Sequence, residues 1–127
     1  MDEIVHYMQK LGLNLYQSRA MVVLLATGEA EAKQICECSG VPYTKIYQIL
    51  KQLEDKGLIE YKLNSPRTYK PRGRKAVLNK LVRKEARRVT YLENEKERQL
   101  QKIGRLKLGA TKGIEQVHPV FNSEPGF

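Results

Sequence analysis

Two short helical patterns joined by a tight turn lie between residues 32 and 56. The first is expected to run from residue 32 to about 38. Residues 39–42 predict the turn, with Gly40 in a positive φ conformation and Pro42 opening the next helix. That helix is expected from Tyr43 to Lys56. Its apolar residues recur at the spacing that places them on one core-facing stripe: Ile46, Ile49, Leu50 and Leu53. The pattern predicts a helix-turn-helix.

Two amphipathic helices are expected before this motif. Residues 2–11 carry an apolar stripe of helical period, made of Ile4, Val5, Met8 and Leu11. After Gly12, Asn14 is a favourable N-cap, and Gln17 can complete a capping box with it. The second helix should end at Thr27-Gly28. Its core-facing residues are Tyr16, Ala20, Met21, Val23 and Leu24.

A β-hairpin is expected directly after the helix-turn-helix. Residues 58–63 alternate and are rich in β-forming side chains. Residues 64–66, Asn-Ser-Pro, form a turn cluster, and residues 67–71 can return as the second strand. Two strands in this position form the wing of a winged helix. Arg67 would lie at the wing tip, within reach of a minor groove or a phosphate.

One long helix is expected from Arg74 to about Leu108, because this stretch has no proline and favours helix throughout. Positions spaced alternately four and three residues apart form a heptad seam, polar at Glu85, Lys96 and Gln99. Its apolar members are Leu78, Val82, Val89, Leu92, Ile103 and Leu106. We interpret the seam as a coiled-coil dimer interface. The alternative is an amphipathic helix that folds back on its own domain.

The predicted fold class is therefore mainly α with a small β wing, a winged helix-turn-helix followed by a long C-terminal dimerisation helix. The expected domains are 1–72 for the winged helix-turn-helix and 73–108 for the coiled-coil helix. Residues 109–127, which contain glycine and proline without a period, are expected to form a flexible tail.

Positive charge is concentrated shortly after the helix-turn-helix. The chain has a formal net charge of +9, and residues 62–88 contain 11 Lys and Arg against the single acid Glu85. A local block of cations is typical of proteins that contact a phosphate backbone.

The exposed face of the second helix of the motif supplies the candidate DNA-reading residues. Polar and cationic side chains on such a face suit a major groove, although a solvated surface helix would show the same pattern. We expect Thr44, Lys45, Gln48 and Lys51 to enter the groove. Tyr43 and Tyr47 flank them and would contact phosphates or sugars. Arg67, Lys70, Arg72 and Arg74 would hold the DNA backbone.

Other classes of function find little support in the sequence. No phosphate-binding glycine loop, paired carboxylates or nucleophile–base arrangement indicates an enzyme, and no cofactor is expected. Cys36 and Cys38 are too few and too closely spaced for a zinc site, so we expect no bound metal. The longest apolar run, residues 20–26, is too short to cross a bilayer. With only two cysteines and no signal peptide, a reducing cytoplasm is the expected compartment.

Three stretches resemble the TrmB-type archaeal transcriptional regulators: LGLNLYQSRA at 11–20, AKQICECSGVPYTKIYQILKQLEDKGLIE at 32–60 and the wing SPRTYKP at 65–71. The resemblance covers roughly the first 75 residues and implies a winged helix-turn-helix that binds DNA. Members usually have a hydroxyl residue near position 31 as a helix cap, where this chain has Glu31. Members often continue into a sugar-binding effector domain, which we expect to be absent here.

The sequence therefore predicts a homodimeric, sequence-specific regulator of transcription that binds double-stranded DNA and associates with the nucleoid. We expect no membrane partner and no small-molecule effector bound within this chain. Two alternatives stay open. One is a non-specific DNA-coating or chromatin protein, and the other is a winged helix used for protein interaction.

Overall fold

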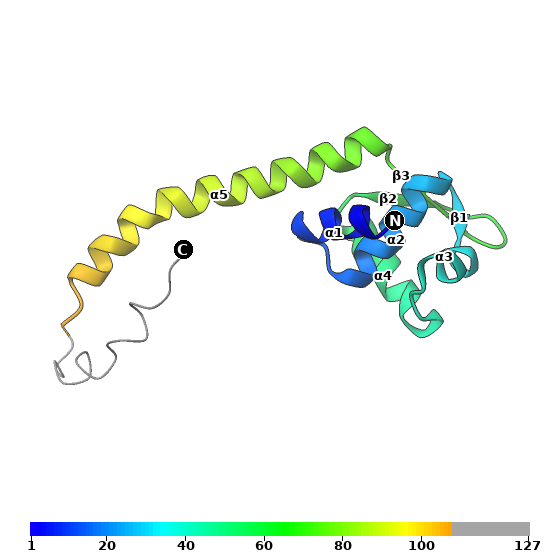
Figure 1. Ribbon diagram of the computed structural model, residues 1–127, viewed down its shortest axis with the longest axis horizontal. Helices are drawn as coiled ribbons and strands as arrows, with labels where there is room; N and C mark the ends of the chain where they lie inside the picture. The colour runs from blue at the N-terminus through cyan, green and yellow to red at the C-terminus, as the bar shows by residue number, and fades with distance from the viewer. Residues whose placement is uncertain (108–127) are drawn as a thin grey trace. The chain divides into compact units, whose positions relative to one another are not determined.

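The fold is mainly helical with a small sheet. The computed structural model describes residues 1–107. Its elements follow one another as α1 (Asp2–Lys10), α2 (Leu15–Thr27), β1 (Ala30–Glu31), α3 (Ala32–Ser39), α4 (Tyr43–Asp55), β2 (Ile59–Lys62), β3 (Thr68–Pro71) and α5 (Arg74–Gly104) (Figure 1). The helix-turn-helix is α3 and α4, and β2 and β3 form the wing. The winged helix-turn-helix and the long C-terminal helix are thus confirmed.

The helix ends follow from local chemistry. At the start of α2, the Asn14 side chain accepts a hydrogen bond from the Gln17 backbone, and Gln17 Oε1 accepts one from the Asn14 backbone, as predicted. Between α3 and α4, Gly40 adopts a left-handed φ of 76°, which costs glycine no steric strain. The helix α3 begins at Ala32 without a hydroxyl cap. In place of that cap, the Gln34 side chain accepts a hydrogen bond from the Glu31 backbone N–H at 2.9 Å.

The sheet has three antiparallel strands in the order β1-β3-β2. The wing pairs Ile59 with Pro71 and Lys62 with Thr68. The sequence did not predict β1, whose two residues pair with Tyr69 and Thr68 of β3. Glu29, just before β1, accepts hydrogen bonds from Lys62 Nζ at 3.1 Å and Thr68 Oγ1 at 3.0 Å. The bond from Lys62, more than the one from Thr68, lowers the pKa of Glu29 below its ordinary value.

One apolar core lies beneath the helix-turn-helix. The helix α2 runs through it, with Ala20, Met21 and Leu24 fully buried. From α4 come the predicted stripe residues, all buried: Ile46, Ile49, Leu50 and Leu53. The prediction for α1 was wrong at Ile4, which is 52% exposed, because only Val5 and Met8 of that helix are buried in the core.

The start of α5 packs on the same core. Val77 and Leu81 are buried there, and Leu78 is partly buried beside them. Residues Met1–Val89 form one compact unit, and the described residues from Thr90 onward belong to a second. Of the predicted seam residues, Val82, Val89, Leu92, Ile103 and Leu106 are exposed in the single chain. The predicted dimer and the boundary at residue 72 stay predictions. The helix α5 ends at Gly104, earlier than the end expected near residue 108, and the predicted tail 109–127 lies outside the described residues.

Candidate nucleic-acid interface

The helix α4 presents one polar face to solvent. The apolar stripe of α4 is buried in the core, and this packing orients the opposite side of the helix toward solvent. The exposed residues on that side are Tyr43, Thr44, Lys45, Tyr47, Gln48 and Lys51. The structure thus brings together all six residues that the sequence assigned to this helix. They form a continuous surface of hydroxyl, amide and ammonium groups.

Lys51 differs from its neighbours because it already has anionic partners. Its Nζ lies 3.4 Å from Glu54 Oε1 and 3.3 Å from Asp55 Oδ1, at the end of the same helix. The contact with Asp55, followed by that with Glu54, raises the pKa of Lys51 above its ordinary value. Lys51 is therefore a firmly charged side chain that must exchange carboxylates for any nucleic-acid partner.

Tyr43 and Tyr47 form a pair at the start of α4. Their ring centroids are 5.8 Å apart with an interplanar angle of 89°, and their hydroxyls are 3.3 Å apart. This hydrogen bond raises the pKa of Tyr47 above its ordinary value, so its phenol is neutral near pH 7. Both rings are more than half exposed. Exposed hydroxyls on a stiff aromatic pair are suited to form hydrogen bonds with phosphate or sugar oxygens.

A groove of about 490 Å³ separates α4 from the wing. Tyr43 and Tyr47 line it on the α4 side, and Arg67 and Tyr69 line it on the wing side. Lys33, in the first turn of α3, lines it too. The predicted wing-tip arginine therefore faces the same hollow as the tyrosine pair, although the two are about 20 residues apart in sequence.

Aromatic contacts hold Arg67 over the wing. Its guanidinium carbon lies 4.4 Å from the ring centroid of Tyr61, a cation–π distance. Tyr61 in turn lies 6.3 Å from Tyr69, centroid to centroid. The planar guanidinium keeps its donors at the rim of the ring, where they can form two parallel hydrogen bonds to a phosphate.

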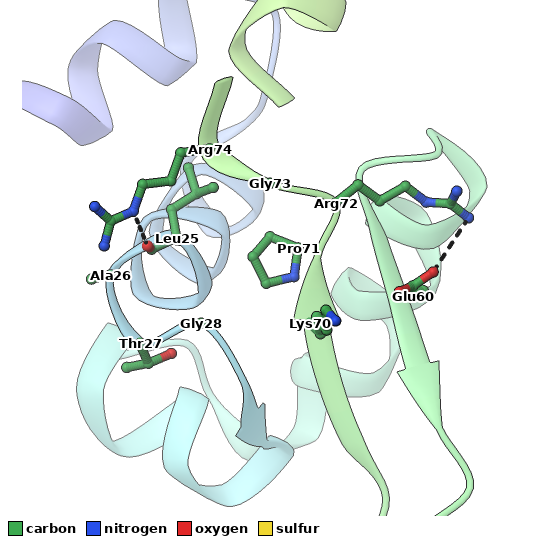
Figure 2. Close-up of a pocket in the computed structure, with 10 residues that line it drawn as sticks. All are labelled: Leu25, Ala26, Thr27, Gly28, Glu60, Lys70, Pro71, Arg72, Gly73 and Arg74. Atoms are coloured by element: carbon green, nitrogen blue, oxygen red, sulfur yellow. Dashed lines mark hydrogen bonds and ion pairs between the residues drawn. The ribbon is translucent and has the colours of Figure 1, made fainter. Parts of the chain in front are cut away.

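The remaining predicted cations lie on another surface. Lys70, Arg72 and Arg74 line a pocket of about 650 Å³ between the end of α2 and the wing (Figure 2). Figure 2 shows Arg74 reaching back to α2, where its Nε donates to the Leu25 carbonyl at 2.9 Å. Arg72 reaches across to Glu60 of β2 at 4.0 Å. These three residues are together in space but do not line the groove beside α4.

The residues missed from sequence include one in the groove and one beneath Arg67. Lys33 is exposed in α3 and shares the hollow with Tyr47, and Tyr61 supports Arg67. Lys33 gave a weak signal as a cation opposite the apolar side of α3. Tyr61 gave none, because a tyrosine in a strand is an ordinary β-forming residue.

Within residues 1–107, no group of three or more His, Cys, Asp or Glu is arranged to hold a metal ion. In the same range, no helix combines the length and apolarity needed to cross a membrane.

Comparison with known proteins agrees with this geometry. Residues 8–73 match the family model described as "Sugar-specific transcriptional regulator TrmB". This match covers the helix-turn-helix, the wing and the groove between them. The chain belongs to the TrmB family. The predicted resemblance is thereby confirmed, and the family consists of transcriptional regulators rather than enzymes.

Individual TrmB-family proteins extend the comparison. The sugar-sensing transcriptional regulator TrmBL1 of Pyrococcus furiosus is 38% identical over 80 residues, which is 63% of this chain and 24% of that protein. The DNA-binding transcriptional repressor TrmBL2 of Thermococcus kodakarensis is 30% identical over 124 residues, 97% of this chain and 43% of that protein. The chain thus spans less than half the length of these relatives.

Solved structures show the same fold. A structure of TrmBL2, described as an archaeal chromatin protein with a novel mode of DNA binding, has a TM-score of 0.71 and 26% identity, covering 99% of this chain and 47% of that one. A possible transcriptional regulator from Methanosarcina mazei has a TM-score of 0.52 at 16% identity and covers 68% of this chain and 82% of that one, which supports the fold alone.

Proposed function

We propose that this TrmB-family chain is a sequence-specific, double-stranded-DNA-binding regulator of transcription that acts as a homodimer at the nucleoid in the cytoplasm. The observation that carries the proposal is the exposed polar face of α4 beside a groove that Arg67 closes from the wing. A helix held by its apolar side, with a free polar side and a flanking cation, suits insertion into a major groove.

The roles of the residues follow from their positions. Thr44, Lys45 and Gln48 reach base edges, because they lie on the outward side of α4 and, among the described residues, have no side-chain hydrogen-bond partner. Lys51 joins them after leaving Glu54 and Asp55. The tyrosine pair and Arg67 bind the DNA backbone from the two sides of the groove. The 1–72 segment is the DNA-binding part in this proposal.

Dimerisation is the second part of the proposal. A single α4 covers only a few base pairs, whereas two recognition helices can read two half-sites a helical turn or more apart. Residues 73–108 supply the coupling through the exposed apolar side chains of α5. Val89 and Leu92, which are 48% and 51% exposed in the single chain, lie between the polar seam positions.

Selection of bound sequences from a random DNA pool tests the specificity. A regulator of this kind enriches a sequence with two related half-sites, and it binds the enriched site at least about a thousandfold more tightly than random DNA. Affinity that does not differ between selected and random DNA would exclude sequence-specific readout.

A DNA-coating role is the second candidate, and the likeness to the chromatin protein TrmBL2 favours it. Such a protein binds all duplexes with similar affinity, and its binding weakens steeply with salt. Salt titration on selected and random duplexes separates the roles. A salt-sensitive but sequence-independent affinity identifies a DNA-coating protein, and salt-insensitive or absent binding identifies a protein-interaction module.

A further inference from the structure

A second cationic surface lies away from the groove beside α4. Three adjoining hollows make it up, and shared residues connect them. Arg72 lines both the pocket of Figure 2 and a smaller hollow of about 280 Å³ beside Gly57. Ala76 and Lys80 line that smaller hollow and also a third one of about 460 Å³ on α5. The third hollow is completed by Asn79, Arg83 and Arg87.

The cations on α5 form one stripe. Lys80, Arg83 and Arg87 are three and four residues apart, so they lie on one side of the helix over roughly 10 Å of its length. All three are exposed, and none takes part in the ion pairs found among residues 1–107. The stripe therefore has its positive charge available for an external partner.

The stripe and the apolar seam occupy opposite sides of α5. At 3.6 residues per turn, Val82 and Val89 lie roughly 150° around the helix from the centre of the stripe. Pairing of two chains through the seam would leave Lys80, Arg83 and Arg87 uncovered.

The wing continues this surface on its outer face. Successive residues of a strand point to opposite sides of the sheet. In β3, Tyr69 faces the groove with Tyr43 and Tyr47, so Lys70 is directed to the other face. Lys70 and Arg72 line the pocket of Figure 2 on that other face. The two cationic surfaces of the domain thus open on opposite sides of the wing.

We propose that Lys80, Arg83 and Arg87, with Arg72, bind the phosphate backbone of a second DNA segment, separate from the duplex that α4 contacts. Arginine forks and an ammonium group arranged along a helix match a row of phosphates and read no sequence. The duplex bound at α4 does not bend back to reach the stripe on α5 of the same domain, because DNA is stiff over about 150 base pairs. The inference rests on the proposed DNA binding only for the first duplex.

A sandwich assay tests the inference. One duplex is fixed to beads and saturated with the full chain, and capture of a second, fluorescent duplex is measured. The test variant is Lys80→Gln with Arg83→Gln and Arg87→Gln. The matched control is Lys102→Gln with Arg105→Gln and Lys107→Gln, which removes three charges from exposed positions further along the same chain. Glutamine keeps helix propensity close to that of Lys and Arg.

The stripe variant is expected to lose at least about fivefold in capture relative to the control, while its affinity for a single duplex stays within about twofold of the control's. Equal capture by both variants would overturn the inference, since a dimer holding two duplexes through two α4 helices gives that result. A parallel fall in capture and in single-duplex affinity would also overturn it and would assign the stripe to one duplex.

Failure of the proposed function gives a different result. Sequence preference is measured separately, by competition between selected and random duplexes for the full chain. A chain without sequence preference that still depends on the stripe for capture would overturn specific readout and support the second surface.

Discussion

Gln48 and Lys51 lie one turn apart on the exposed face of α4, but their surroundings differ. Gln48 is exposed and makes no side-chain hydrogen bond among the described residues, whereas Lys51 pairs with Glu54 and Asp55. A base edge can bind Gln48 without breaking an earlier contact. Binding to Lys51 requires an exchange of partners, which lowers its net contribution. Gln48 is therefore the sharper test of sequence reading.

Gln48→Ala is expected to relax base preference at about one position and to cost roughly 1–3 kcal/mol on the selected site. The reason is loss of a two-donor, two-acceptor amide from the groove-facing side of α4. Competition binding with selected and random duplexes measures it, with Gln9→Ala on the exposed surface of α1 as control. Equal losses on the two duplexes would show that Gln48 does not read sequence.

Arg67→Ala is expected to weaken binding to every sequence and to reduce the slope of log affinity against log salt by about one unit. Arg67 stacks 4.4 Å over Tyr61 at the wing tip and carries one positive charge toward the groove. Affinities at four salt concentrations give the slope. Lys10→Ala at the end of α1 is the control, and a slope equal to the control's would place Arg67 off the DNA.

For single residues, the sequence predicts which side chains are exposed but not which distant residues they contact. The outward side of α4 follows from the spacing of Ile46, Leu50 and Leu53, so its polar residues could be named in advance. Contacts such as Arg74 with the Leu25 carbonyl join residues 49 positions apart, and no local pattern encodes them. The division of the cations into two surfaces therefore required the fold.

Among the elements, α5 shows how an apolar pattern can serve two purposes. Its start carries apolar doublets, Val77-Leu78 and Leu81-Val82. The heptad reading selected Leu78 and Val82, but the core takes Val77 and Leu81 and leaves Val82 exposed. Both sets have helical period, so periodicity alone does not separate them. Packing against the winged helix decides which set is buried. The strand β1 escaped notice because two residues show no alternation.

Leu81→Ala is expected to destabilise the fold by about 2–5 kcal/mol, since it removes a buried side chain from the shared core. Val82→Ala, one position further along and exposed, should cost less than about 0.5 kcal/mol in the monomer. Urea unfolding followed by circular dichroism compares them. Equal midpoints for the two variants would mean that α5 does not pack on the winged helix through Leu81.

The outer face of the sheet should respond to acid. The pKa of Glu29 is lowered mainly by the Lys62 hydrogen bond, so the folded state binds fewer protons than the unfolded state as pH falls. The contribution of ionised Glu29 to the stability of the fold is therefore present above the unfolded pKa, near 4.5. It disappears as pH falls through the lower pKa of the folded state. Glu29→Gln should shift the urea midpoint downward at pH 7 and have less effect at pH 3. A larger difference at pH 3 would contradict this sign.

For the whole molecule, we propose that the exposed apolar side chains of α5 set the assembly. Aspartate at both Val89 and Leu92 is expected to give monomers, because two charges in a small apolar interface are costly to bury. Sedimentation measures the mass, and the monomers should lose most affinity for a two-half-site duplex. Ile4→Asp with Tyr7→Asp, at the exposed apolar patch on α1, is the matched control. Dissociation of the α1 variant alone would move the interface to α1.

The tyrosine-lined groove has a practical consequence for spectroscopy. The chain contains 7 tyrosines and no tryptophan, so tyrosine supplies its intrinsic emission. Tyr43, Tyr47 and Tyr69 line the groove, and Tyr61 lies beneath the wing-tip arginine. Over half of the fluorophores are therefore placed at the surface proposed to meet DNA. Unlabelled protein should lose a large part of its emission on binding, which makes the native side chains a built-in optical reporter of occupancy at α4.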